Sequence, residues 1–273
     1  MKPSRTEAPP EQAPASTRCS IRKWDIFRVL LRSFFVQSVW NYRTLISVGF
    51  GICLIPILKR LYDDPQSQKE FLSRHLKFFN AHPYMTSYAL GVSIHLEEAL
   101  ANGKAEAEEQ ISRVKDLLIT ILGGLGDTLF WATIKPASLI FGVMTLILFQ
   151  SQTTRMVALL VTFLLYNIPH IYFRIKGILE GYRYGIEVHK FIHKNRFRKL
   201  ESAYFYIGVI AFLLFFVFLI RTLIQENPFY LLMMVVSMTA YMFIYKFTKR
   251  FYLSIYLTLL LGIVSGIVFY RVI

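Results

Sequence analysis

The sequence contains little cysteine, with two residues among 273, Cys19 and Cys53. Cys19 ends a polar segment and Cys53 lies in an apolar run, so neither a disulfide framework nor a CxxC metal motif is present. Charged residues are also few, at 18%, whereas 55% of the chain is hydrophobic and the mean hydropathy is +0.44. A soluble domain cannot bury that much apolar surface. The composition therefore predicts an integral membrane protein.

Acidic side chains are scarce relative to basic ones, 17 against 31, which gives a net charge of +14. In a soluble protein this excess would indicate nucleic acid, but no basic and aromatic segment stands clear of a hydrophobic run. The basic residues lie between apolar blocks instead, a pattern typical of membrane topology and of contact with anionic lipid. We therefore expect anionic lipid, and no nucleic acid, among the partners.

Catalytic signatures are missing as well. The chain has no Walker loop, no HExxH, no third glycine to complete a dinucleotide fingerprint after Gly124-Leu-Gly126, and no nucleophile elbow. His95 and Glu98 are three residues apart, and His189 and His193 have helical spacing, but two ligands are a weak metal signal. We expect no metal, no cofactor and no covalent chemistry on this chain.

The N-terminal 44 residues contain no signal peptide and no long apolar block. Four prolines within the first 17 residues predict a disordered tail over residues 1–20. Residues 21–44 predict an amphipathic helix in which Asp25, Arg28 and Arg32 form a polar stripe. Such a helix lies either along the inner membrane surface or against the protein's own core, and both interpretations remain open. Its apolar positions are Trp24, Phe27, Leu31, Phe34 and Phe35.

The C-terminal region, residues 150–273, predicts about four transmembrane helices, since a span requires about 20 apolar residues. The blocks are Met156–Phe173, interrupted by Asn167, Pro169 and His170 and therefore predicted to be kinked, and then Ala203–Ile220, Pro228–Tyr245 and Phe251–Tyr270. Residues 174–199 predict a basic cytoplasmic loop with eight Lys and Arg against two Glu, and Lys246, Lys249 and Arg250 join the last two spans. The positive-inside rule places both segments in the cytoplasm, the N-terminus with them, and the C-terminus outside.

Residues 45–149 contain apolar stretches that are too short or too interrupted for simple spans. They are Leu45–Leu58, Tyr84–Leu96 and Leu117–Ile134. A 13-residue helix extends about 20 Å, short of a hydrocarbon core of about 30 Å. The expected fold is thus an all-α integral membrane protein with an interfacial amphipathic helix, broken or re-entrant helical hairpins, and then the C-terminal spans. Short, glycine-interrupted segments mark substrate sites in transporters.

The segment Gly123–Trp131 is the most informative part of this region. Its three glycines predict a helix break. A carboxylate at membrane depth costs roughly 2.5–3.5 kcal/mol on insertion scales, so Asp127 requires a role there. One such role is sugar binding. A carboxylate can accept hydrogen bonds from two neighbouring sugar hydroxyls, and the Trp131 indole, four residues on and on the same helix face, can cover the apolar face of a pyranose. The alternative is that Asp127 caps a helix starting after the glycines.

Two further clusters flank the short apolar stretch that Pro83 is expected to start. Asn80 and His82 are predicted to bind sugar hydroxyls at a hairpin tip, or else to satisfy backbone groups in a turn. Glu97 and Glu98 end the same stretch. Because neighbouring helical residues point about 100° apart, one of them is expected to contact substrate or a partner while the other is solvated.

These segments, in this order, resemble the IID component of the mannose/fructose/sorbose phosphotransferase family. The resemblance covers residues 24–270 and is strong to about 136. It is carried by Arg32–Asn41, Gly49-Phe50, Pro56, Leu61-Tyr62, the His75–Met85 run HLKFFNAHPYM, Leu96-Glu97-Glu98, and the Gly126–Pro136 run GDTLFWATIKP.

The resemblance implies a multi-pass bacterial inner-membrane subunit that pairs with a IIC membrane subunit, in a trimer of IIC–IID units with elevator-like motion. Phosphate would pass through soluble IIA and IIB carriers, and IIB would phosphorylate a hexose-type sugar, so this chain is expected to be non-catalytic. Two alternatives remain: a IID-like scaffold that does not transport, and an unrelated ion-coupled transporter or intramembrane enzyme with Asp127 and Glu98 as proton relays. The expected substrate-binding residues are Asn80, His82, Glu97, Glu98, Asp127 and Trp131.

Overall fold

The computed structural model describes residues 20–192 and 194–270, so all but the last residue of the predicted N-terminal tail lies outside the described residues. Helices form nearly all the regular structure within these ranges, where the only β pairings are two isolated bridges. This confirms the all-α prediction. The chain divides into two compact units, Met1–Gly208 and Val209–Ile273.

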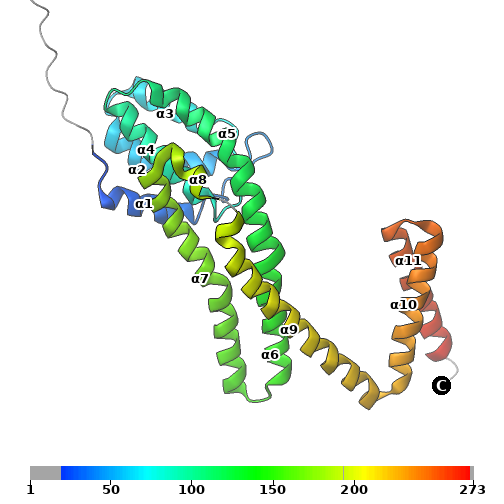
Figure 1. Ribbon diagram of the computed structural model, residues 1–273. Helices are drawn as coiled ribbons and strands as arrows, with labels where there is room; N and C mark the ends of the chain where they lie inside the picture. The colour runs from blue at the N-terminus through cyan, green and yellow to red at the C-terminus, as the bar shows by residue number, and fades with distance from the viewer. Residues whose placement is uncertain (1–19, 193, 271–273) are drawn as a thin grey trace, which may run out of the picture. The chain divides into compact units, whose positions relative to one another are not determined.

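The first unit has a head of short helices and a hairpin of two long helical arms (Figure 1). The head contains α1 (Lys23–Ser33), α2 (Ser47–Leu61), α3 (Pro65–His75), α4 (Thr86–Ala101), the 3₁₀ turn η2 (Gly185–Glu187) and α8 (Val188–Phe191). One arm is the unbroken succession of α5 (Glu106–Gly126), the π-helix η1 (Asp127–Ile134) and α6 (Lys135–Leu148). The other arm is α7 (Gln152–Tyr184).

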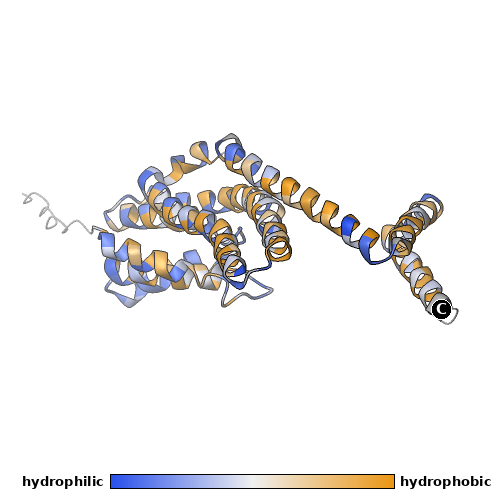
Figure 2. Ribbon diagram, turned by 90° about the horizontal axis from the view of Figure 1, so that it is seen from below, coloured by the Kyte–Doolittle hydropathy of each residue, from blue (hydrophilic) through white to orange (hydrophobic). Residues whose placement is uncertain are grey.

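The helix α9 (Lys194–Glu226) begins in the first unit, and the second unit contains its remainder with α10 (Pro228–Thr248) and α11 (Phe251–Tyr270). Hydrophobic residues run along most of α9 (Figure 2). Four stretches of the described chain are long and apolar enough to cross a membrane: Glu106–Leu148, Gln152–Phe191, Arg196–Glu226 and Phe229–Thr248. Three of them match predicted spans. The last predicted span is helical, but its stretch Phe251–Gly266 is a shorter apolar helix than these four.

The stretch that matches no predicted span, Glu106–Leu148, shows that the predicted break at residues 123–126 is wrong. Gly123, Gly124 and Gly126 continue α5 into η1 without interruption. Relative to alanine, glycine destabilises a helix by only about 1 kcal/mol. Leaving a backbone N–H or C=O group without a hydrogen bond in apolar surroundings costs more than that, so the helix continues through the glycines. The predicted basic loop at 174–199 is also largely helical, because α7 continues to Tyr184 and the chain turns at Gly185, which has φ +51°.

The other two interrupted stretches form α2 and α4, which are mostly buried within the head. Their entry into the bilayer stays a prediction. Helix α4 forms its most extensive pairing with α7, and glycine makes the crossing close. A Cβ at Gly91 would lie 2.3 Å from the Ile178 carbonyl oxygen, and one at Gly181 would lie 2.3 Å from the Tyr88 carbonyl oxygen. Backbone therefore meets backbone where the two helices cross.

Helix α1 packs on the head through a face that includes Ile26, Val29 and Leu30 rather than through its large aromatic side chains. Asp25, Val29 and Ser33 are buried, and Asp25 lies 3.9 Å from Arg60 of α2. The large apolar side chains point outward, with Trp24 exposed by 62%. The packing of α1 on the core thus agrees in part with one interpretation, and its place at the membrane surface stays a prediction. The outward set is Trp24, Phe27, Leu31 and Phe35, whereas the half-exposed Phe34 ring meets the ring of His170 and the guanidinium of Arg174.

Candidate functional site

The turn before α4 positions two of the predicted site residues differently. Asn80 is exposed, whereas His82 is 2% exposed. The His82 carbonyl accepts hydrogen bonds from the backbone amides of Met85 and Thr86, and its Nδ1 accepts one from the Tyr84 amide at 3.3 Å. Helix α4 begins at Thr86, three residues after Pro83. The turn thus satisfies backbone groups, as the alternative interpretation expected.

One atom of His82 remains unsatisfied. Because Nδ1 accepts a hydrogen bond, Nε2 carries the proton, and this buried Nε2 has no partner among the described residues. The ring stacks on Phe130 with centroids 5.1 Å apart and meets the edge of Trp131 at 5.8 Å. Gly126 permits this approach, since a Cβ there would lie 2.2 Å from the His82 Cβ. The structure therefore brings His82 and Trp131 together, as the site prediction required.

Asp127 opens the π-helix η1 and lies in the middle of the arm Glu106–Leu148. Its capping role is therefore wrong, because α5 continues into η1 through this position and the Asp127 side chain makes no cap hydrogen bond. The side chain is exposed and makes no hydrogen bond or ion pair with the residues that the structure describes. Trp131 is 49% exposed, and the Lys135 ammonium lies 4.2 Å from its ring centroid. Short π-helical segments within α-helices occur frequently at functional sites.

The site prediction missed a polar row on α7. Tyr166, His170 and Arg174 recur every four residues, which places them on one helix face and is the signal that the sequence offered. The hydroxyls of Tyr84 and Tyr166 are 2.6 Å apart, and the rings of Tyr84 and His170 are 4.1 Å apart. Arg174 Nε donates to His170 Nε2 at 3.0 Å. This row therefore contacts Tyr84, two residues after His82.

Phe130 and Phe173 fix the level of the site on the hairpin, since their ring centroids are 5.9 Å apart across the two arms. Asp127 therefore lies near the level of Arg174, the first charged residue after the apolar stretch 156–173. This level is the head-side end of the apolar hairpin rather than its middle.

Glu97 is fully buried at the centre of a polar cluster in the head. Arg74 donates to both of its carboxylate oxygens, at 3.1 and 3.0 Å. His75 Nε2 lies 2.8 Å from Oε1, and the Tyr62 hydroxyl donates to Oε2 at 2.7 Å. Burial alone would raise the pKa of Glu97, but the hydrogen bonds from His75 and Arg74 outweigh it and hold that pKa below its usual value. This geometry is that of a structural ion pair, with no oxygen left for a ligand.

Glu98 is engaged as well, so the expectation that one of the two glutamates is solvated is wrong. Its carboxylate accepts from the Ile21 amide at 2.8 Å and from the Tyr182 hydroxyl at 2.6 Å, which ties the start of α1 and the end of α7 to α4. His95 Nδ1 lies 2.9 Å from the Tyr182 carbonyl. Among the described residues, no group of three or more His, Cys, Asp and Glu side chains could hold a metal; His193 lies outside them.

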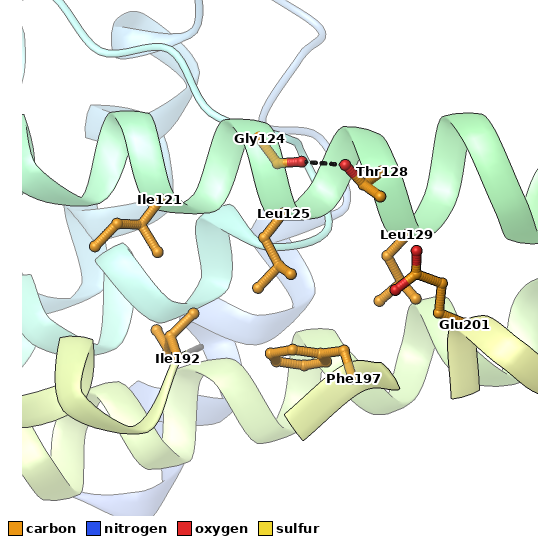
Figure 3. A pocket seen from close by; sticks show the side chains of 8 residues that line it. All are labelled: Ile121, Gly124, Leu125, Thr128, Leu129, Ile192, Phe197 and Glu201. Carbon is orange, nitrogen blue, oxygen red and sulfur yellow. Dashed lines mark hydrogen bonds between the residues drawn. The ribbon is translucent and has the colours of Figure 1, made fainter. Parts of the chain in front are cut away.

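A cavity of about 240 Å³ lies beside the same arm (Figure 3). It is mostly apolar, and the Phe197 ring forms one wall. The Thr128 hydroxyl donates to the Gly124 carbonyl at 2.9 Å. The Glu201 carboxylate makes no hydrogen bond or ion pair within the described chain; it lies between the predicted basic loop and the next predicted span and was not among the expected site residues. The lining residues are Ile121, Gly124, Leu125, Thr128, Leu129, Ile192, Phe197 and Glu201.

Acidification is expected to destabilise the head between about pH 6.5 and pH 4. Burial lowers the pKa of His75 to about 4, and burial together with the charge of Arg174 lowers the pKa of His82 to about 4, both from a usual 6.5. Both rings are neutral when folded and take up a proton more readily when unfolded. Stability present above pH 6.5 is therefore lost as the pH falls toward 4, and the contribution of Glu97 is lost at still lower pH.

Unfolding midpoints of the detergent-solubilised chain from about pH 7.5 to about pH 4.5 measure this effect. His82→Gln should reduce the decline, because glutamine does not titrate. A midpoint that stays constant over this range would contradict the prediction.

The chain is similar throughout to one protein family. The family model for the mannose/fructose/sorbose family IID component of the PTS system matches residues 20–272. The mannose-specific EIID component of Escherichia coli K12 is 30% identical over 71% of this chain and 67% of its own length. The fructose permease IID component of Bacillus subtilis is 30% identical over 69% and 67%. A solved structure of the mannose transporter ManYZ with microcin E492 matches with a TM-score of 0.57 and 30% identity, over 71% of this chain and 69% of that one.

Proposed function

Because the chain belongs to the mannose/fructose/sorbose family of PTS IID components, we propose that it is the sugar-translocating partner of a IIC subunit. The match over residues 20–272 carries this proposal, and the likeness to the mannose transporter ManYZ supports it. The helices of the hairpin and of the second unit then cross the bacterial inner membrane. The substrate is a hexose-type sugar, and the IIC–IID units assemble as a trimer with elevator-like motion.

In this proposal, phosphoryl transfer takes place on other subunits. Cytoplasmic IIA and IIB carriers receive phosphate from phosphoenolpyruvate, and IIB phosphorylates the sugar as it arrives. Phosphorylation traps the sugar inside, so the membrane part needs only a binding site with alternating access. The absence of a nucleophile elbow from this sequence agrees with that division of labour.

The proposed sugar site is the face of η1 that carries Asp127 and Trp131, with His82 behind it. The free Asp127 carboxylate accepts hydrogen bonds from sugar hydroxyls, and the half-exposed Trp131 ring packs against the apolar face of the sugar. The unsatisfied His82 Nε2 supplies a donor once the turn shifts by a small amount. Exposed Asn80 belongs to the same turn, whereas the contacts of Glu97 and Glu98 assign both to support of the fold.

The proposed orientation places the head and the N-terminus in the cytoplasm. The Glu106–Leu148 arm then runs outward and α7 returns inward, so that α9, α10 and α11 alternate and the C-terminus ends outside. This path agrees with the basic residues at 190–199 and 246–250 on the inner side.

Asp127→Asn is expected to weaken sugar binding by at least about tenfold, since a hydrogen bond to a charged group contributes about 1.5–3 kcal/mol. The exposed side chain holds no other part of the fold, so co-purification with IIC should be unchanged. Sugar affinity of the reconstituted IIC–IID complex is the measurement, with Glu201→Gln as the matched variant on the cavity side of the arm.

The outcomes separate the candidate sites and functions. A loss confined to Glu201→Gln would move the sugar site into the cavity of Figure 3. Unchanged affinity in both variants would remove Asp127 from the site. A complex that binds no sugar would favour a non-transporting scaffold, and uptake that continues without phosphocarriers would favour an ion-coupled transporter.

A further inference from the structure

The outward aromatic face of α1 is fixed in place by polar contacts on the opposite side of the helix. At the N-terminal end, Arg60 of α2 donates to the Ser20 carbonyl at 3.2 Å and approaches Asp25. At the C-terminal end, Arg174 of α7 donates to the Ser33 carbonyl and, at 3.2 Å, to its hydroxyl. Both ends are therefore held to the head, and the helix cannot rotate to bury Trp24 and its neighbours. The outward direction is a property of the fold.

The Arg174 contact also indicates the level of α1 relative to the membrane. Residues 156–173 contain no Asp, Glu, Lys or Arg, and Arg155 and Arg174 bracket them. These 18 residues rise about 27 Å in a helix, close to a hydrocarbon thickness of about 30 Å. Arg174 thus marks the head-side boundary of the membrane. Because it holds Ser33, the C-terminal end of α1 lies at that boundary too.

The charges around the aromatic face complement an anionic surface. Lys23 and Arg28 are exposed, while the only acidic residue of α1, Asp25, is buried beside Arg60. The Trp24 and Phe27 rings stack at 5.3 Å and present one continuous apolar surface. Aromatic residues flanked by Lys and Arg are typical of helices that lie in the headgroup region of a bilayer.

From these observations we propose that α1 lies in the anionic leaflet on the head side of the membrane, with Trp24, Phe27 and Leu31 among the acyl chains and Lys23 and Arg28 at lipid phosphates. This leaflet is the cytoplasmic one in the orientation proposed above. Through Arg174 the surface contact extends to the polar row beside the His82 turn. The proposal thus assigns α1 the task of setting the depth of the head at the membrane.

The three tryptophans of the chain, Trp24, Trp40 and Trp131, permit a direct test. The full chain with Trp40→Phe and Trp131→Phe retains Trp24 as its single tryptophan and is reconstituted into vesicles of phosphatidylglycerol and phosphatidylcholine. Lipids brominated near the headgroup should quench Trp24 at least about twofold more than lipids brominated near the chain end. The matched control has all three tryptophans replaced and Lys69→Trp on exposed α3, where acrylamide but not brominated lipid should quench.

A second variant tests the charge contribution. Arg28→Glu in the Trp24-only background should reduce bromine quenching, and more so in vesicles rich in phosphatidylglycerol than in pure phosphatidylcholine. Quenching of Trp24 by acrylamide alone would overturn the proposal, as would protection from both quenchers that appears only with IIC present, since a protein would then cover this face. None of these readouts depends on sugar binding or on which leaflet faces the cytoplasm, so the proposed function stands or fails separately.

Discussion

Replacing Glu97 with glutamine is expected to lower the free energy of unfolding by about 3–5 kcal/mol, the usual cost of removing one partner from a buried ion pair. Glu97 is 0% exposed, and Arg74 has a side-chain exposure of only 8%. Glutamine keeps the shape but removes the charge, so the buried Arg74 guanidinium retains only the exposed Glu108 carboxylate, 3.5 Å away, as a charged partner. Its amide also places two donors where Arg74, His75 and Tyr62 require an acceptor.

Glu108→Gln is the matched control, because the same substitution then affects the same arginine from the surface. Glu108 lies 3.5 Å from Arg74 with its side chain 62% exposed, and an exposed pair contributes about 1 kcal/mol or less. Thermal unfolding of the detergent-solubilised chain, followed by intrinsic fluorescence, should show a midpoint lower by about 10 °C for Glu97→Gln and little change for Glu108→Gln. Equal shifts would show that the Arg74–Glu97 pair is not a main stabilising contact.

Gly91→Ala is the second substitution with a large expected effect, a loss of about 3 kcal/mol from overpacking. The new Cβ would lie 2.3 Å from the Ile178 carbonyl oxygen and 2.7 Å from the Tyr182 amide nitrogen, both of which are backbone atoms of α7. No side chain can move aside to accommodate it, so the two helices must separate. Their separation would also disturb the contact of Tyr84 with His170 at the start of α4.

Gly124→Ala gives the opposite expectation on the neighbouring arm. A Cβ at Gly124 meets nothing within 4 Å, so alanine should be neutral or stabilise by up to about 1 kcal/mol through its helix propensity. The same thermal measurement distinguishes the two variants. If Gly91→Ala were as stable as Gly124→Ala, the close crossing of α4 and α7 would be refuted.

The membrane arrangement was largely predictable because long apolar blocks have one stable conformation in a bilayer. Met156–Phe173 and Ala203–Ile220 became parts of α7 and α9 for that reason. The glycines at 123–126 misled the prediction, since helix propensity describes an isolated chain, whereas these glycines lie in a long helix and Gly126 makes room for the ring of His82. The sequence around a glycine does not show which distant group will occupy the space that its missing side chain leaves.

The candidate site was predictable only where its members are close in sequence. Asp127 and Trp131 were identified from one segment, and His82 from another, and the structure places His82 against Trp131. Glu97 and Glu98 were misassigned because their partners come from distant positions: Arg74 lies 23 residues away and Tyr182 84 residues away from the glutamate that it contacts. A buried carboxylate and a ligand-binding one look alike until those partners are located.

Arg174 is 3% exposed, yet within the described chain it contacts no carboxylate. Dipoles and ring faces from separate segments disperse its charge: the Ser33 carbonyl, the His170 ring nitrogen, and the Phe34 and Tyr84 rings. A shortened chain that starts after Ser33 would remove both Ser33 acceptors and leave the His170 ring nitrogen as the one hydrogen-bond acceptor for this buried cation among the residues that the structure describes. The N-terminal helix therefore stabilises the membrane hairpin through this contact. Truncation of the chain after Ser33 should fail to yield a folded protein, although the longest hydrophobic helices remain intact.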